Sequence, residues 1–129
     1  MPDDARPPVI DRAPAEAGKP VVDPAVWTGT EMASRSDWIY TLTADDLAAL
    51  RVVADRIRAE IGNDPDGLLD IGATDIDLGA FTAPMADVFH QLKDGRGFQL
   101  IRGMPVSTWD RLDLAIAYWV MGQQIGTPL

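Results

Sequence analysis

A five-residue segment, Phe98–Arg102 (FQLIR), sets the strongest condition on the fold of this chain. The segment is apolar on both faces apart from Gln99, and such a strand is typical of the interior of a sheet, with a neighbour on each edge. The sequence offers one other clear strand, residues 38–42, where large apolar side chains alternate with others. We therefore expect an α+β chain. A strand buried inside a sheet needs a neighbouring strand on each side, and the sequence offers only one, which indicates that part of the domain is missing.

Three segments have the apolar spacing of helices, at residues 44–61, 83–93 and 108–125. Thr43 and Asp46 form a capping-box-like pattern at the start of the first. The third is predicted to begin near Thr108, and it is apolar nearly all round from Leu114 to Met121. A helix of this kind is expected to be buried on several sides.

Residues 63–82 are rich in turn-forming and acidic residues, and we expect a solvated connector there. Two acidic clusters within it resemble the start of a calcium loop: Asp64, Asp66 and Gly67, and Asp75, Asp77 and Gly79. Neither has the regular run of oxygen ligands or the closing glutamate of such a loop. The clusters therefore do not predict a calcium site.

The first 35 residues are rich in Pro, Asp and Ala, and we expect a disordered arm there, followed by one domain over residues 36–129. The net charge of −9 makes nucleic acids and anionic membrane surfaces unsuitable partners. The absence of cysteine excludes disulfides and thiolate chemistry. With no signal-peptide pattern and no apolar run of the ~18 residues that span a bilayer, we expect a cytoplasmic protein.

Gly95 and Gly97 resemble the start of a dinucleotide-binding fingerprint, but position 100 is leucine and the pair precedes a strand. We expect these glycines to end a helix and to form the turn into the strand. His90 is the only histidine, so this chain cannot form a two-histidine, one-carboxylate metal site, and position 92 is not acidic. We expect His90 to lie at the surface or at the boundary of the core.

Arg96 and Arg102 are the basic residues nearest the predicted buried strand. Arg102 could bind a carboxylate through two N–H groups, but the many carboxylates of the chain favour internal salt bridges for both arginines. The other candidates are interpreted as core aromatics or helix caps: Trp109, Tyr118, Trp119, Ser107 and Thr108. The residues alone predict no catalytic, cofactor-binding or metal-binding residue.

The sequence DGRGFQLIRGMP over residues 94–105 is followed by AYW at 117–119 and GTP at 126–128. With these motifs, the chain from Trp38 onward resembles the amino-terminal region of the taurine catabolism dioxygenase (TauD/TfdA) family, which are non-haem Fe(II)- and 2-oxoglutarate-dependent oxygenases. It departs from the family pattern after the tryptophan, where Val and Met replace a glycine and an apolar residue, and at a Gln pair where basic residues are usual.

The resemblance implies a double-stranded β-helix (jelly-roll) scaffold with flanking helices, of which this chain is the amino-terminal part, truncated before the metal-binding core. It also implies that the ligands of the full enzyme lie beyond Leu129. These are the HxD pair and the distant histidine, which together hold the iron, and the arginine that holds 2-oxoglutarate. We therefore expect a fragment of a dioxygenase that hydroxylates a small organic acid. The fragment alone is expected to bind neither iron nor 2-oxoglutarate and to be inactive.

A second hypothesis is a small acidic interaction module that retains the same scaffold without catalysis. It would cover its apolar helix by self-association or with a partner. The abrupt end of the chain just after a helix favours truncation. Under the truncation hypothesis, we expect exposed apolar faces on the strand at 98–102 and on the helix at 108–125.

Overall fold

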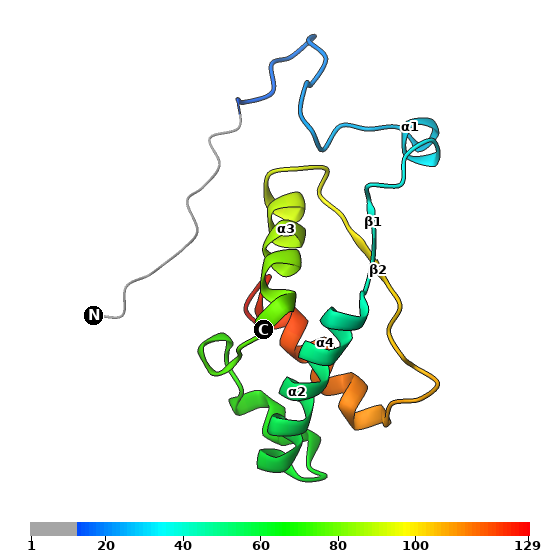
Figure 1. The fold of residues 1–129 in the computed structure, drawn as a ribbon. Helices are drawn as coiled ribbons and strands as arrows, with labels where there is room; N and C mark the ends of the chain where they lie inside the picture. Colours follow the sequence, from blue (N-terminus) through cyan, green and yellow to red (C-terminus); the bar gives the residue numbers. More distant parts are fainter. Residues whose placement is uncertain (1–12) are drawn as a thin grey trace, which may run out of the picture.

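The computed structural model describes residues 13–129 (Figure 1), and residues 1–12 lie outside the described part. In chain order, the elements are α1 (Gly29–Ala33), β1 (Ile39–Thr41), α2 (Ala44–Ile61), three 3₁₀ turns η1 (Pro65–Asp70), η2 (Ala73–Asp75) and η3 (Gly79–Phe81), α3 (Thr82–Lys93), β2 (Leu100–Arg102) and α4 (Arg111–Gln123). The two predicted strands and the three predicted helices are present, with shorter bounds for both strands and for the last helix.

The two strands pair in parallel, with Tyr40 opposite Ile101. Two further hydrogen bonds join β2 to the residues on either side of β1. The Leu100 N–H donates to the Trp38 carbonyl oxygen at 2.9 Å, and the Leu42 N–H donates to the Arg102 carbonyl oxygen at 2.8 Å. Parallel neighbours need a long crossover connection. Here the crossover comprises α2, the three 3₁₀ turns and α3, which bring the chain back to begin β2 beside the start of β1 (Figure 1).

The jelly-roll prediction is wrong for the described residues, which are mostly helical and contain one sheet of two short parallel strands. A jelly roll is built from antiparallel strands, whereas the segment between β1 and β2 has apolar residues at helical spacing and folds into helices. The prediction transferred the fold of a whole family to a stretch whose own periodicity is 3.6 rather than 2.

The strand β2 is an edge strand, although its sequence predicts an interior one. Within residues 13–129 it has only β1 beside it, and Leu100 is 38% exposed. Ile101 packs against the core, while Leu100 and Arg102 point to the other face. An apolar side chain therefore lies on each face of β2, but only the face that carries Ile101 is covered by helices.

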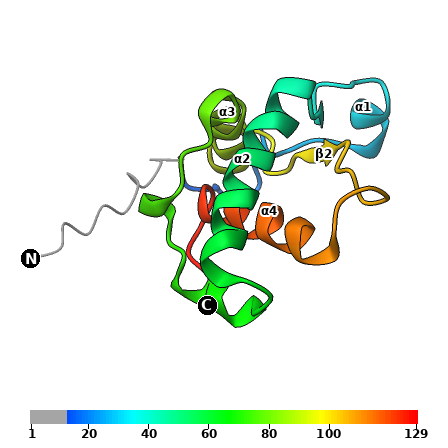
Figure 2. The same cartoon turned by 60° about the horizontal axis from the view of Figure 1, so that its bottom comes forward.

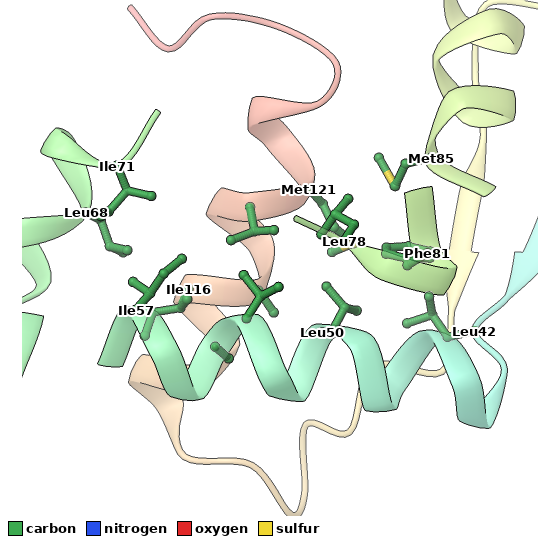
Figure 3. Close-up of a cluster of buried hydrophobic side chains, with 14 of the residues drawn as sticks. Leu42, Leu50, Ile57, Leu68, Ile71, Leu78, Phe81, Met85, Ile116 and Met121 are labelled. Atoms are coloured by element: carbon green, nitrogen blue, oxygen red, sulfur yellow. The ribbon is translucent and has the colours of Figure 1, made fainter. Parts of the chain in front are cut away.

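The core lies between α2, α4 and η3, and α2 packs directly across α4 (Figure 2). Figure 3 shows Leu50 and Ile57 on one face of α2, beside Ile116 from α4 and Phe81 from η3. Leu50, Ile57, Phe81 and Ile116 are at most 1% exposed. The apolar spacing of α2 thus identifies the face that builds the core.

The prediction of a solvated connector at residues 63–82 is wrong, because this segment forms η1, η2 and η3 and buries Leu68, Ile71, Leu78 and Phe81. The indole N–H of Trp119 donates to the Ile71 carbonyl oxygen at 2.9 Å, which joins the segment to α4. Apolar side chains in short 3₁₀ turns follow no long period, so their burial has no periodic signature in the sequence.

The predicted disordered arm extends to residue 35, and its first 12 residues lie outside the described part. Beyond them, α1 is a formed helix whose Thr28 and Glu31 make a reciprocal capping box. Met32 is buried, and its carbonyl oxygen accepts a hydrogen bond from the Trp38 indole at 3.0 Å. The last part of the predicted arm is therefore attached to the domain.

The helix α4 begins at Arg111 rather than near Thr108, because the Asp110 side chain accepts the Leu112 N–H at 2.9 Å and caps the helix there. Its sequence is apolar nearly all round, yet Tyr118 is 76% exposed. One side of α4 therefore lacks the cover that its composition predicts.

Candidate functional site

The motif GRGF at residues 95–98 forms the turn from α3 into β2, and Arg96 holds it in place. Arg96 is 6% exposed. Its guanidinium donates to the Asp37 carbonyl oxygen at 2.9 Å and to the Phe98 carbonyl oxygen at 3.2 Å, and it also bonds to the Gln99 side-chain oxygen. It lies 3.4 Å from the Asp37 carboxylate as well. The internal salt bridge predicted for Arg96 is present, and the donors are used within the protein.

Glycines at both ends of β2 adopt conformations that other residues rarely reach. Gly97 has φ of 87° and Gly103 has φ of 95°. The Gly97 N–H donates to the Gln91 carbonyl oxygen at 2.9 Å, so this glycine turns the chain from the end of α3 toward the strand, as the sequence predicts. The GRGFQLIRG segment is thus a strand enclosed by two left-handed turns.

Among the described residues, Arg102 does not form the predicted internal salt bridge. Its side chain is exposed, and it has no hydrogen-bond or ion-pair partner within the described part of the chain. It lies on the face of β2 opposite to Ile101. Arg102 therefore remains available to a group outside residues 13–129.

His90 lies at the surface of α3, with its side chain 64% exposed and its Nδ1 3.2 Å from an Asp94 carboxylate oxygen. Together with Arg96 and Tyr40 it lines a cavity of ≈ 270 Å³ between α3 and β1. The guanidinium in this cavity is already bonded to protein oxygens, and His90 faces no nucleophile there.

Asp46, at the start of α2, is a buried carboxylate. The sequence predicts its role in capping the helix but not its burial. Asp46 is 3% exposed, and its Oδ2 accepts the Tyr40 hydroxyl at 2.6 Å and the Thr43 N–H at 2.9 Å. Burial by itself raises the pKa of Asp46, but the hydrogen bonds from Tyr40 and Thr43 outweigh it and hold the pKa below its ordinary value. This group joins β1 to α2.

The Tyr40 phenol should make the stability of the protein depend on pH in the alkaline range. Its burial, and then its bond to the Asp46 carboxylate, raise the pKa of Tyr40 to about 12. Because the folded-state pKa lies above the ordinary value of about 10, the stabilising contribution is complete below pH 10 and is lost as the pH rises through about 12. In urea unfolding at a series of pH values, the Tyr40→Phe variant should lose less stability over this window than the parent. Equal losses would contradict the prediction, and Tyr118→Phe, at an exposed position, serves as the control.

A cluster of ion pairs joins α2 to α4. Asp113 lies 3.0 Å from Arg51 and 2.9 Å from Arg58, and its side chain is 13% exposed. Arg58 also contacts Asp110 at 3.1 Å, and the Arg51 guanidinium lies 4.5 Å from the centre of the Trp109 ring. Trp109 is partly buried against the core, in agreement with its predicted structural role. The Asp113 carboxylate is thus shared by two arginines, unlike the carboxylate of an isolated surface ion pair.

Replacement of Asp113 by alanine should destabilise the protein by about 1–3 kcal/mol, because two half-covered guanidinium groups lose their shared carboxylate. Chemical denaturation followed by tryptophan fluorescence measures this cost. Asp55→Ala is the matched control, because Asp55 also bonds Arg51 but its side chain is 65% exposed. Equal costs for the two variants would show that burial of Asp113 contributes nothing.

The residues that the structure describes do not fit a bound Fe(II) or 2-oxoglutarate. Within residues 13–129, no three His, Asp or Glu side chains are arranged to hold a metal ion. Several acidic side chains of the connector cap local turns instead, as when Asp64 accepts the Asp66 N–H and Asp77 accepts the Gly79 N–H. Arg96 is committed to protein oxygens, and Thr41 is the residue that lies opposite Arg102 across the strand pair. No reaction step can be assigned to these residues.

A largely apolar groove of ≈ 400 Å³ lies between α3, β2 and α4. The helix α3 contributes Met85 and Leu92, the strand contributes Ile101, and α4 contributes Met121. Tyr118 stands at the groove with most of its ring exposed. The groove lies on the face of β2 that Ile101 occupies, and we name it the α3–β2–α4 groove.

Comparison with protein-family models gives no match, and comparison with curated proteins gives no significant match. Among the helices that the structure describes, none has both the length and the apolar character that crossing a bilayer requires.

Proposed function

We propose that this chain is the amino-terminal, non-catalytic part of an Fe(II)- and 2-oxoglutarate-dependent oxygenase that acts on a small organic acid in the cytoplasm. The observation that carries the proposal is the structure of the GRGFQLIRG segment. It forms a strand that pairs with β1 on one side and has no neighbouring strand on the other side within residues 13–129, and it does not form a binding loop. In this role the chain supplies structure, and the ligands for iron and 2-oxoglutarate belong to residues outside it.

Two features support a scaffold role. First, the polar groups of the motif are used to fix its own geometry, since Arg96 bonds across to Asp37 and the Trp27 indole donates to the Arg96 carbonyl oxygen at 3.0 Å. Second, the free edge of β2 and the α3–β2–α4 groove allow the sheet to be extended by further chain. A sheet edge beside an apolar surface is a common place for another strand to add.

The proposal is tested by the mass and activity of the protein from its native source, captured with an antibody against residues 38–61. We expect a species well above 14.0 kDa that releases succinate from 2-oxoglutarate when Fe(II) and small organic acids are supplied. The isolated 129-residue chain is the control and should release none. A native species of 14.0 kDa, or a larger one without any 2-oxoglutarate turnover, would overturn the proposal.

A second candidate, an interaction module without catalysis, is favoured by the closed core between α2, α4 and η3. Leu50, Ile57 and Phe81 are almost completely covered by residues of this chain alone. Such a core can support a domain that folds by itself and offers a surface to a partner. The native mass separates the two candidates, since the module predicts a folded protein of 14.0 kDa.

A further inference from the structure

We propose that Trp27 acts as a releasable clasp, which closes the segment before α1 onto the α3–β2 turn and which, when it opens, loosens the start of β2 while the core stays folded. We name the contacts of Trp27 with Arg96 and Phe98 the Trp27 clasp. The inference goes beyond the proposed function, because it concerns a movement of the described chain and applies to both candidates above.

The segment that contains α1 leaves the α3–β2 turn and returns to it. The Trp27 indole N–H donates to the Arg96 carbonyl oxygen at 3.0 Å, and the Arg96 guanidinium donates to the Asp37 carbonyl oxygen at 2.9 Å. The centre of the Phe98 ring lies 4.9 Å from that of Trp27 and 5.9 Å from that of Trp38. In both ribbon views, α1 lies at the rim of the molecule, next to the start of β1 (Figure 1, Figure 2). A surface loop whose ends meet in this way is an Ω loop.

The end of this loop at Trp38 is built into the domain. The Trp38 indole donates to the Met32 carbonyl oxygen at 3.0 Å and to the Arg35 carbonyl oxygen at 2.9 Å. The Trp38 carbonyl oxygen accepts the Leu100 N–H at 2.9 Å, and Met32 is buried. Release of this end would disrupt both α1 and the pairing of the strands, so we assign it as the fixed end.

The end at Trp27 has a weaker attachment. Trp27 is 41% exposed, and Val22 and Val26 before it are 95% and 57% exposed. The Val26 N–H donates to the Asp23 carbonyl oxygen at 2.9 Å and closes a β-turn, in which Pro24 holds the second position that proline favours. This turn orients Trp27, but Trp27 can leave its place without uncovering the core between α2, α4 and η3. Such a local opening costs less free energy than global unfolding.

Opening of the clasp acts on β2 through Arg96. It removes the indole donor from the Arg96 carbonyl oxygen, and Gly97 beside it has φ of 87°, in a region where glycine moves freely. The Arg96 guanidinium holds the carbonyl oxygen of Asp37. The next residue, Trp38, accepts the hydrogen bond from Leu100 at the start of β2. A movement of the turn therefore reaches the first hydrogen bond of the strand pair.

The test is amide hydrogen exchange of the full chain at a series of urea concentrations below the unfolding transition. In the parent, the Gly97 and Leu100 amides, which bond to Gln91 and Trp38, should exchange through an opening that depends little on urea. The Ala54 amide, on the buried face of α2, should exchange more slowly and through an opening that depends strongly on urea. A steep urea dependence reports the exposure of much surface, and a shallow one reports a local opening.

The matched variants are Trp27→Ala and Val22→Ala. Trp27→Ala removes the indole bond and the ring contact, and it should accelerate exchange of the Gly97 and Leu100 amides about tenfold, while the Ala54 amide stays protected. Val22 lies in the same segment and is 95% exposed, so its replacement should leave these rates near the parent values. Gly97 and Leu100 amides that exchange only together with Ala54, or whose rates do not respond to Trp27→Ala, would each overturn the proposal.

Discussion

Replacement of Phe81 by alanine should lower the free energy of unfolding by about 3–5 kcal/mol. Phe81 is 0% exposed at the end of η3, where Figure 3 shows it near Leu42 and Met85. Removal of the ring leaves a cavity between α2 and α3 that rigid backbone elements cannot close. Since small domains are stable by only about 5–15 kcal/mol, the variant should be partly unfolded well below the melting temperature of the parent.

Thermal and urea unfolding followed by circular dichroism measure this effect. The control is Leu69→Ala, because Leu69 lies in the same connector but is 73% exposed and should cost less than about 0.5 kcal/mol. The pair also tests the fold itself. If the connector were solvated, as the sequence suggests, both substitutions would cost little. Similar small costs at Phe81 and Leu69 would therefore contradict the packing in the structure.

Replacement of Asp46 by alanine should cost about 3 kcal/mol, because the buried Tyr40 hydroxyl and the Thr43 N–H lose their acceptor together. The substitution also removes one half of the capping box at the start of α2. The folded pKa of Asp46 lies below its ordinary value. Its stabilising contribution is therefore full above the unfolded-state pKa of about 3.9 and is lost as the pH falls through the folded-state pKa.

Acid and urea titrations of the parent and the variant measure this contribution. Asp45→Ala is the matched control, since Asp45 lies in the same first turn but is exposed, and only its interaction with the helix dipole of about 0.5 kcal/mol is lost. If the cost of Asp46→Ala at neutral pH equals that of Asp45→Ala, the bond to Tyr40 does not contribute to stability.

The parts of the fold that depend on local sequence could be predicted from it. The start of α2 follows from Thr43 and Asp46, which cap each other three residues apart. The turn at Gly97 follows from glycine chemistry alone. The bond from Tyr40 to Asp46 could not be predicted, because it depends on the direction in which β1 enters the helix, and no short-range pattern encodes that direction.

The burial of the connector and the exposure of β2 depend on tertiary packing. Leu78 and Phe81 lie in short turns whose apolar residues follow no regular spacing. They are buried because α2 and α4 pack against them in the folded protein. The apolar residues of β2 suggest cover on both faces, yet the fold provides it on one. Of the two candidate arginines, Arg96 formed its predicted bonds because Asp37 lies beside it in space, and Arg102 has no carboxylate partner within residues 13–129.

The parallel pairing of β1 with β2 has a consequence for the order in which the protein folds during synthesis. Ile39 pairs with Leu100, which lies 61 positions further along the chain. Contacts so distant carry a large loop-closure entropy and form slowly. On the ribosome, β1 leaves the exit tunnel long before its partner exists, whereas the hydrogen bonds of α2 can form at once. The sheet therefore cannot form until β2 has followed α2 and α3 out of the tunnel, and β1 is the segment that a chaperone would meet unpaired.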